Sequence, residues 1–353
     1  MFALEGHIKM KVAMISTWKV RCGIASYTEN LANALGQQDV EVFIVRLPRF
    51  GFKNPQIIQN VAEHVPFQEV DLVHVQHEYG LYQGFELALY NVLKAANKPI
   101  VTTMHAVGNW DIDNIIKKFS NHIIVHNKFC FKRFNYPLMF KNTSIIPHGA
   151  SPTVATPNKE AKEALSLKPN WKVVGYLGFV SSYKGLETLI ETMIKVKNAG
   201  LLIGGGWHKG DQTDYINRLK EVTLKVLPNR CQWLGFVEDS KLATVYGAMD
   251  ILVYPSLYAT ESGALITALS YGKAVIANAL PPFKEKEKEG ALITFRSITD
   301  LQHKIKKLLA DDHLRLKLEE GAKAYAEKTS WINVASKHVE LYSSLTPSKE
   351  QSI

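Results

Sequence analysis

Short runs of apolar and β-branched residues alternate along most of the chain with longer stretches in which apolar residues recur every three or four positions. Runs of the first kind predict buried strands, and stretches of the second kind predict amphipathic helices. The alternation is typical of βα units around a parallel sheet, because strands covered by helices on both faces are apolar throughout. The sequence therefore predicts an α/β protein.

This pattern starts twice along the chain. In the first half, strands are expected at Lys11–Ser16, Val40–Val45, Val70–Val75, Pro99–Met104, His122–Val125 and Ser144–Ile146, with helices near Tyr27–Leu35, Phe85–Ala96, Asp111–Phe119 and Lys128–Phe134. In the second half, strands are expected at Lys172–Leu177, Leu201–Ile203, Cys231–Leu234, Ile251–Tyr254, Ala274–Ala277 and Leu292–Thr294, with helices at Leu186–Lys197, Asp214–Val226, Asp239–Met249, Ala264–Tyr271, Thr299–Ala310 and Leu314–Lys328. Gly149–Asn170, rich in proline, threonine, asparagine and lysine, separates the halves. We therefore expect domains at 1–165 and 166–330, then a helix near Ile332–Leu345 and a frayed end at Thr346–Ile353.

Composition and charge narrow the class of protein. The chain has 353 residues, 46% of them apolar and 21% charged, as in a globular protein with enough apolar surface for two cores. Its net charge of +9 favours anionic partners such as nucleotides, sugar phosphates and acidic lipid headgroups. We expect no nucleic-acid partner.

The expected location is the cytoplasm. Cys22, Cys130 and Cys231 lie far apart without C-x-x-C spacing, which fits a reducing compartment and predicts neither a zinc site nor a redox pair. The segment Met1–Lys9 lacks the apolar core of a signal peptide, and no run of about 18 apolar residues could span a bilayer. Peripheral contact with the inner face of the membrane stays open.

The first candidate site loop, Thr17–Ser26, follows the first expected strand. In open α/β sheets, ligands bind beyond the carboxyl ends of the strands. Gly23 stands at the start of the next helix, where backbone N–H groups can approach a phosphate, and Cys22 and Ile24 flank it on the side expected for an acceptor. An ordinary strand-to-helix turn is the alternative.

Histidines end two further strands of the first half. His105 follows Thr102-Thr103-Met104 and could donate to a sugar hydroxyl or polarise a reacting group, although a structural histidine is the alternative. His77, Glu78 and Tyr79 end another strand as a polar cluster suited to acceptor binding. The histidines of that cluster lack a clear third ligand, so no metal site is expected.

In the second half, the loop after Lys172–Leu177 ends in Tyr183, Lys184 and Gly185 at the start of a helix. A lysine there can place a fixed positive charge and helix-end N–H groups on a diphosphate, and so stabilise it as a leaving group. A surface lysine is the alternative.

A single carboxylate marks the loop after Ile251–Tyr254. Glu261 precedes Ser262, Gly263 and Ala264, which open a short helix whose amides could bind an anion. Glu261 is therefore a candidate site residue, and a purely structural role is the alternative.

Taken in order, these loops resemble the retaining GT-B glycosyltransferases of the family-4 group, and the resemblance covers nearly the whole chain. The matching elements are Cys22-Gly23-Ile24-Ala25, Thr103-Met104-His105, Ile146-Pro147-His148-Gly149, Tyr183-Lys184-Gly185, Leu234-Gly235-Phe236-Val237 and Gly272-Lys273-Ala274-Val275-Ile276.

The resemblance implies a GT-B architecture, in which two Rossmann-like parallel-sheet domains face each other across a cleft. The N-terminal domain would bind the acceptor, the C-terminal domain a UDP- or GDP-linked sugar, and the closing segment 331–353 would return to the first domain. A hexose-type sugar would pass with retained configuration to a glycan, a lipid-linked or a small-molecule acceptor, without a metal or another cofactor.

The same resemblance assigns roles to residues. By analogy, His105 contacts the transferred sugar, Lys184 the diphosphate, and Glu261 with the amides of Ser262–Ala264 the sugar ring and phosphate; these three side chains are the expected catalytic residues. Tyr183, Gly185 and Gly23 would line the donor's phosphates.

At two places the sequence departs from the family pattern, and these departures favour an alternative to an active enzyme. Phe179 stands where the family has an arginine, and Ala259 and Thr267 stand where it has two glutamates, so Glu261 lies two residues later than expected. Thr267 could still offer its hydroxyl to ribose, and Tyr183 or Arg21 could replace the missing cation.

The alternative is a catalytically silent GT-B protein that binds a nucleotide sugar or a partner. A GT-B epimerase would need further acid and base carboxylates, and a phosphorylase a Schiff-base lysine motif, which we do not find.

A basic and aromatic stretch, 117–141, lacks acidic residues. Its cations are Lys117, Lys118, Lys128, Lys132, Arg133 and Lys141, and its aromatic residues are Phe119, Phe129, Phe131, Phe134, Tyr136 and Phe140. Such a stretch could lie on an anionic membrane surface, which would favour a lipid-linked acceptor. A solvated face with half of the aromatic residues in the core is the alternative.

Overall fold

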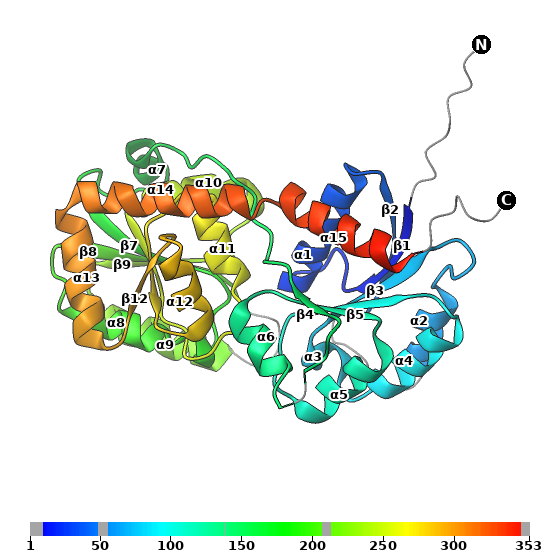
Figure 1. Cartoon of the computed structure of the whole chain (residues 1–353). Helices are drawn as coiled ribbons and strands as arrows, with labels where there is room; N and C mark the ends of the chain where they lie inside the picture. The colour runs from blue at the N-terminus through cyan, green and yellow to red at the C-terminus, as the bar shows by residue number, and fades with distance from the viewer. Residues whose placement is uncertain (1–9, 49–55, 138, 207–212, 347–353) are drawn as a thin grey trace, which may run out of the picture. The chain divides into compact units, whose positions relative to one another are not determined.

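The computed structural model of the chain describes residues 10–48, 56–137, 139–206 and 213–346. The chain forms two compact units, one made of Met1–Gly149 with Trp331–Ile353 and the other of Ala150–Ser330 (Figure 1). The segment before Met10 and the expected frayed end beyond Thr346 lie outside the described residues.

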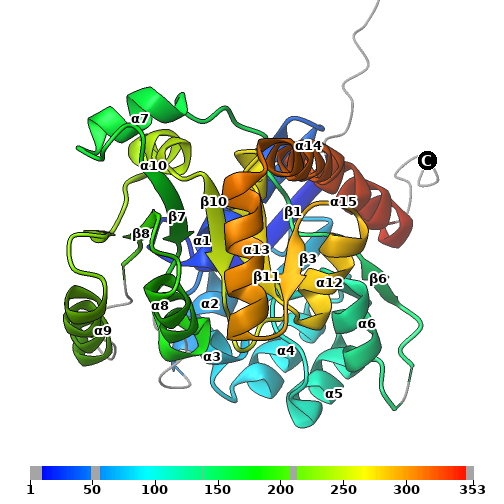
Figure 2. The same ribbon diagram turned by 90° about the vertical axis from the view of Figure 1, so that its left-hand side faces the viewer.

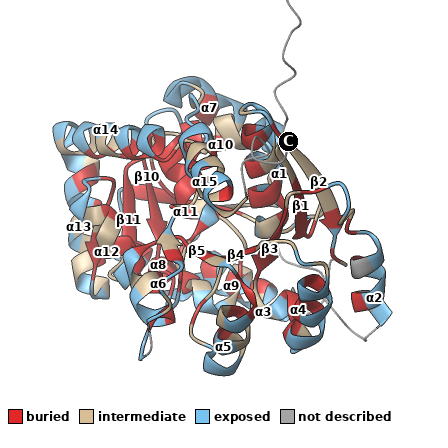
Figure 3. Cartoon of the chain, turned by 45° about the vertical axis from the view of Figure 1, so that its right-hand side comes forward, coloured by how far each residue is buried: buried red, intermediate tan, exposed pale blue. Residues whose placement is uncertain are grey.

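Each unit is built on one parallel sheet of six strands. In the first unit the strand order is β2-β1-β3-β4-β5-β6. Its strands are β1 (Met10–Ser16), β2 (Val40–Arg46), β3 (Leu72–His77), β4 (Ile100–Met104), β5 (His122–Val125) and β6 (Thr143–Ile145), and its helices are α1 (Gly23–Gly36), α2 (Gln56–Glu63), α3 (Tyr79–Tyr82), α4 (Glu86–Ala95), α5 (Trp110–Phe119), α6 (Lys128–Phe134) and α15 (Trp331–Leu345). The central strands are buried almost throughout (Figure 3).

The second unit repeats this plan with the order β12-β11-β10-β7-β8-β9. Its strands are β7 (Lys172–Leu177), β8 (Ala199–Gly204), β9 (Cys231–Gly235), β10 (Ile251–Tyr254), β11 (Val275–Asn278) and β12 (Ile293–Phe295). Its helices are α7 (Asn158–Ala164), the 3₁₀ turn η1 (Ser182–Lys184), α8 (Leu186–Ile194), α9 (Thr213–Val226), the 3₁₀ turn η2 (Asp239–Lys241), α10 (Leu242–Ala248), α11 (Gly263–Ser270), α12 (Pro281–Lys288), α13 (Ile298–Ala310) and α14 (Asp312–Lys328). Helices α8 and α13 pack against its strands (Figure 2).

The α/β fold expected from the sequence is confirmed, and each expected strand is present within one or two residues of its expected ends. The sequence did not predict α2, α3, α7 or α12. Helix α3 is a single turn, and α12 has two prolines at its start and is mostly charged, so neither shows a clear apolar period.

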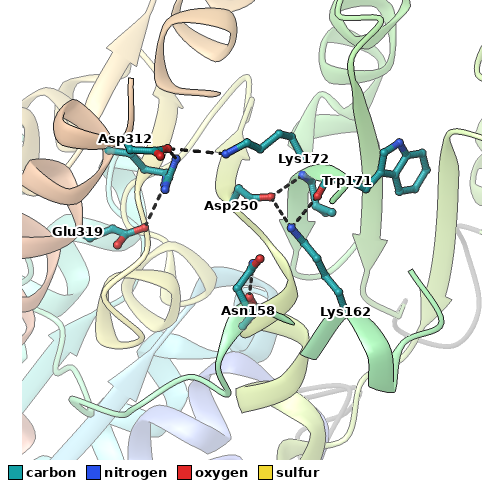
Figure 4. A network of polar contacts seen from close by, with 10 residues as sticks. Asn158, Lys162, Trp171, Lys172, Asp250, Asp312 and Glu319 are labelled. Atoms are coloured by element: carbon teal, nitrogen blue, oxygen red, sulfur yellow. Dashed lines mark hydrogen bonds and ion pairs between the residues drawn. The ribbon is translucent and has the colours of Figure 1, made fainter. Parts of the chain in front are cut away.

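Residues 150–165 belong to the second unit. From the sequence, we expected them in the first domain. Their helix, α7, is tied to the second sheet by Lys162, which is buried. Its ammonium group donates to the carbonyl oxygen of Trp171 at 2.6 Å and to the Asp250 carboxylate at 3.1 Å (Figure 4). Because α7 carries these long-range bonds, the break between the units falls before it, at Gly149.

Helix α15 brings the end of the chain back to the first unit, where it packs beside α1. Val334, Ala335 and Tyr342 are buried in a cluster with residues of α1 and the sheet. At Gly149, a Cβ atom would lie 2.3 Å from the ring of Trp331, so only glycine lets the helix start this close to the chain that leaves the first unit.

Candidate functional site

The second unit has its topological switch point between β7 and β10. From β7 the chain continues to β8 and β9 on one side, and it later returns to β10, β11 and β12 on the other side. In open α/β sheets, ligands bind beyond the carboxyl ends of the strands at such a switch point. Both donor-side loops expected from the sequence start here.

The loop after β7 lies directly against the loop after β10. The N–H of Leu257 donates to the carbonyl oxygen of Tyr183 at 2.8 Å. Gly185 has φ +65°, and a Cβ atom there would lie 2.4 Å from the carbonyl oxygen of Pro255. Glycine is thus required at 185 both for its backbone conformation and for this close approach.

Lys184 provides a positive charge at this edge. Its side chain is half-buried, and Nζ lies 4.6 Å from the ring centroid of Tyr183, which is 48% exposed. No carboxylate within the described part of the chain forms an ion pair with Lys184. Its charge is therefore available to an anion.

The start of α11 lies on the same edge. Ser262 caps this helix, and its hydroxyl accepts from the N–H of Leu265 at 3.3 Å. The first turn of an α-helix leaves N–H groups without intrahelical acceptors, and those of Gly263 and Ala264 are among them. The buried Tyr254 hydroxyl lies 2.8 Å from the carbonyl oxygen of Ala264 and 3.1 Å from that of Leu177, so it ties α11 to the end of β7.

Glu261 is held inside the second unit. One carboxylate oxygen accepts from the N–H of Ser262 at 2.9 Å, and the other accepts from Nζ of Lys286 on α12 at 2.8 Å. The two side chains are 6% and 3% exposed. Burial alone would lower the pKa of Lys286, but attraction to Glu261 and Tyr325 and the hydrogen bond to Glu261 raise it above its ordinary value.

Lys286 was not among the site residues expected from the sequence. The available signal was its position three residues after Phe283, which is fully buried, on the same face of a short charged helix. At two of the three positions that depart from the family pattern, Tyr176 donates its hydroxyl proton to the carbonyl oxygen of Phe179, and the Thr267 hydroxyl donates to the carbonyl oxygen of Gly263.

In the first unit the switch point lies between β1 and β3, and the loop after β1 leads to α1. Cys22 precedes α1 in extended conformation, and its side chain makes no cap bond to the helix. Gly23 is exposed, and a Cβ atom there would meet nothing within 4 Å. Ile24 packs partly against the core of the unit. A side chain at position 23 would therefore meet open space.

His105 lies in a hydrogen-bonded chain of side chains. Its Nε2 is 3.0 Å from the Gln76 side-chain oxygen, and its Nδ1 is 3.3 Å from Nε2 of His126. The Tyr27 ring packs edge-on against His105 at 4.7 Å. Burial, followed by the neighbouring histidines, holds the pKa of His105 well below its ordinary value, so the imidazole is neutral at pH 7.

The cluster after β3 points mainly into the first unit. His77 is fully buried, 3.2 Å from the Glu86 carboxylate. Glu78 caps α3 by accepting from the N–H of Gly80, and burial raises its pKa. Tyr79 donates its hydroxyl proton to Asp113 at 2.6 Å. The described residues contain no cluster of histidine, cysteine and carboxylate groups that could hold a metal ion.

Most of the aromatic residues in 117–141 contribute to the core. Phe119 and Phe134 are buried, and Phe129, Phe131 and Phe140 pack partly against the same cluster. Tyr136 is 68% exposed and contacts the ring of Trp110, itself 40% exposed, at 5.9 Å. No helix within the described ranges has the length and apolar content needed to cross a membrane.

Residues 157–325 match the family model for glycosyl transferases group 1. D-inositol 3-phosphate glycosyltransferase of Corynebacterium jeikeium is 26% identical over 218 residues, which are 58% of this chain and 52% of that protein. An uncharacterized glycosyltransferase of Methanocaldococcus jannaschii is 26% identical over 189 residues, 51% of this chain and 47% of that protein. The chain thus spans about half the length of these curated relatives.

Solved structures match nearly the whole chain. Anabaena HepE in complex with UDP has a TM-score of 0.78 at 18% identity and covers 95% of this chain and 100% of its own. Sucrose-phosphate synthase from Thermosynechococcus elongatus has a TM-score of 0.79 at 18% identity, over 96% and 99% of the two chains. The fold is GT-B.

Proposed function

We propose that the chain is a retaining, metal-independent glycosyltransferase that moves a hexose-type sugar from a UDP- or GDP-linked donor to an acceptor. The observation that carries the proposal is that Lys184, which forms no ion pair with a carboxylate of the described residues, and the start of α11 both lie at the switch point between β7 and β10. A cation and helix-end amides at one edge suit a diphosphate. The match of 157–325 to group 1 glycosyl transferases and the UDP bound in HepE support the same assignment.

In the proposed reaction, the acceptor hydroxyl attacks the anomeric carbon from the face on which the nucleoside diphosphate leaves. The bond from that carbon to the phosphate oxygen breaks, and the departing phosphate oxygen takes the acceptor proton. Lys184 and the amides of Gly263 and Ala264 stabilise the negative charge that develops on the diphosphate. The neutral imidazole of His105 would act as a hydrogen-bonding group near the transferred sugar.

The acceptor is proposed to be lipid-linked or otherwise presented at an anionic membrane surface. The support is the exposed ring pair of Trp110 and Tyr136, which lies in a part of the chain with the exposed cations Lys132, Arg133 and Lys141. Aromatic rings together with cations favour the headgroup region of an anionic bilayer.

Thermal-shift measurements with UDP, GDP, ADP and their sugars test the donor assignment. A nucleotide at a hundredfold its dissociation constant stabilises the folded protein by about 2.7 kcal/mol. We expect Lys184→Ala to weaken the preferred nucleotide at least about tenfold, because it removes a charge-assisted contact. Lys195→Ala, an exposed lysine at the other end of α8, is the matched control and should leave affinity unchanged.

The outcomes separate the proposal from its alternative. Failure of all these nucleotides to stabilise the protein would contradict the donor assignment. Nucleotide binding without donor hydrolysis or transfer would favour the catalytically silent GT-B protein, an alternative motivated by Phe179 and Thr267.

A further inference from the structure

The buried pair of Glu261 and Lys286 occupies the carboxyl edge of the second sheet. Glu261 belongs to the loop that joins β10 to α11, and Lys286 comes from α12, which follows β11. A second buried lysine–carboxylate pair, Lys162 with Asp250, lies at the opposite end of β10. The two pairs are similar in chemistry and burial, but only the first adjoins the proposed donor site.

The Glu261 carboxylate already makes short bonds inside the unit through both of its oxygens. One of these bonds holds the N–H of Ser262, the residue whose hydroxyl caps α11. Lys286 in turn lies 5.9 Å from the ring centroid of Tyr325 on α14, so it links α12, α14 and the start of α11. Glu261 and Lys286 thus hold the start of α11 in place, an arrangement that we call a clamp. A carboxylate that is 6% exposed is a poor candidate for a direct contact with a sugar.

Lys286 compensates the negative charge of Glu261 beside the start of α11. An uncompensated carboxylate next to the amides of Gly263 and Ala264 would oppose the binding of a phosphate at the positive end of α11. Burying a carboxylate without a partner is also strongly unfavourable. Lys286 neutralises Glu261 and fixes the direction of its carboxylate, so the carboxylate neither opposes a phosphate at α11 nor is buried without a partner.

We propose that Lys286 and Glu261 form a positioning pair that fixes the start of α11 for the donor diphosphate. The identity of the ligand, a donor diphosphate, rests on the proposed function. The clamp itself rests on the structure alone. It assigns Glu261 a role through Ser262 and α11, in place of the direct contact with the sugar that the family resemblance implies.

Four proteins test the pair: the unchanged chain, Glu261→Gln, Lys286→Met and the double variant. Glutamine keeps an oxygen that can accept from the Ser262 N–H, and methionine keeps the approximate length of lysine without its charge. Two measurements are made on each protein, namely hydrogen–deuterium exchange of a peptide that covers the start of α11 and the dissociation constant for UDP and GDP.

We expect each single variant to speed exchange at the start of α11 and to weaken the nucleotide at least about tenfold, because each leaves a buried group of the pair without its partner. The double variant leaves no unpaired charge. It should slow hydrogen exchange at the start of α11 again and bring nucleotide affinity back to within about threefold of the unchanged chain.

Three results would overturn the proposal. The first is exchange in the single variants equal to that of the unchanged chain. The second is a double variant in which exchange recovers but affinity stays at the level of Glu261→Gln, which would mean that the Glu261 carboxylate touches the nucleotide. The third is single variants that bind the nucleotide as well as the unchanged chain.

Failure of the proposed function gives a different result. If the unchanged chain binds neither UDP nor GDP, the donor assignment fails, while the exchange measurement still decides whether the clamp exists. The buried control is the double variant Lys162→Met with Asp250→Asn, which should lower stability without changing affinity. The exposed control removes the surface pair of Lys328 and Glu289, also 2.8 Å apart, and should change neither readout.

Discussion

We expect His338 to make the docking of α15 sensitive to acid. It lies fully buried on this helix, where Nδ1 donates to the carbonyl oxygen of Val334 at 2.8 Å. Within the described residues, Nε2 has no hydrogen-bond partner. Burial lowers the pKa of His338 from 6.5 to about 4, and the bond to Val334 acts in the opposite direction.

The size of the effect follows from these two pKa values. Between pH 6.5 and 4 the unfolded chain binds a proton at this position and the folded chain does not, so the free energy of unfolding falls as the pH falls through this window. From pH 7 to pH 4.5, the loss that this one group causes is about 2 kcal/mol. His74, whose ring lies 5.7 Å from that of His338 and whose pKa is also lowered, should add to the loss.

Replacing His338 by leucine isolates its share. Urea unfolding is measured at pH 7 and pH 4.5, and hydrogen exchange of α15 identifies the transition that releases the helix. We expect His338→Leu to unfold at nearly the same urea concentration as the unchanged chain at pH 7 and to lose about 2 kcal/mol less on going to pH 4.5. His313→Leu, at an exposed histidine of α14, is the control and should keep the full loss. An equal loss in His338→Leu and the unchanged chain would refute the reasoning.

Two other predictions test local packing and the membrane surface. Gly205 has φ +144°, and a Cβ atom there would lie 1.7 Å from the carbonyl oxygen of Gly178, so Gly205→Ala should lower the free energy of unfolding by at least about 2 kcal/mol. In urea unfolding, Gly36→Ala, where a Cβ atom meets nothing within 4 Å, should stay within about 1 kcal/mol of the unchanged chain, and equal effects of the two changes would contradict the argument. Replacing Trp110 and Tyr136 together by serine should reduce cosedimentation with vesicles of anionic lipid and leave the background with zwitterionic vesicles unchanged. Undiminished binding of that variant to anionic vesicles would exclude the ring pair as the contact.

The local pattern of the sequence was enough to place the strands and most helices. A buried parallel strand needs an apolar run and a covering helix needs a period near 3.6, and both are properties of consecutive residues. For this reason Lys172–Leu177 and Ile251–Tyr254 were found as strands, and the loops that carry Lys184 and Glu261 followed from them. Helix α7 was missed as part of the second unit because its position depends on a bond between Lys162 and Asp250, 88 residues apart.

Only the tertiary structure decided what the candidate side chains touch. No pattern in the sequence indicated that His77 would be fully buried beside Glu86, or that both oxygens of Glu261 would be bonded within the second unit. These partners are set by packing between elements that are distant along the chain, and an ion pair leaves no periodic trace in sequence. The sequence alone thus determined where the loops of the site begin, because strand ends are local features. Which of their groups face a ligand and which hold the loops in place depended on how the separate helices pack.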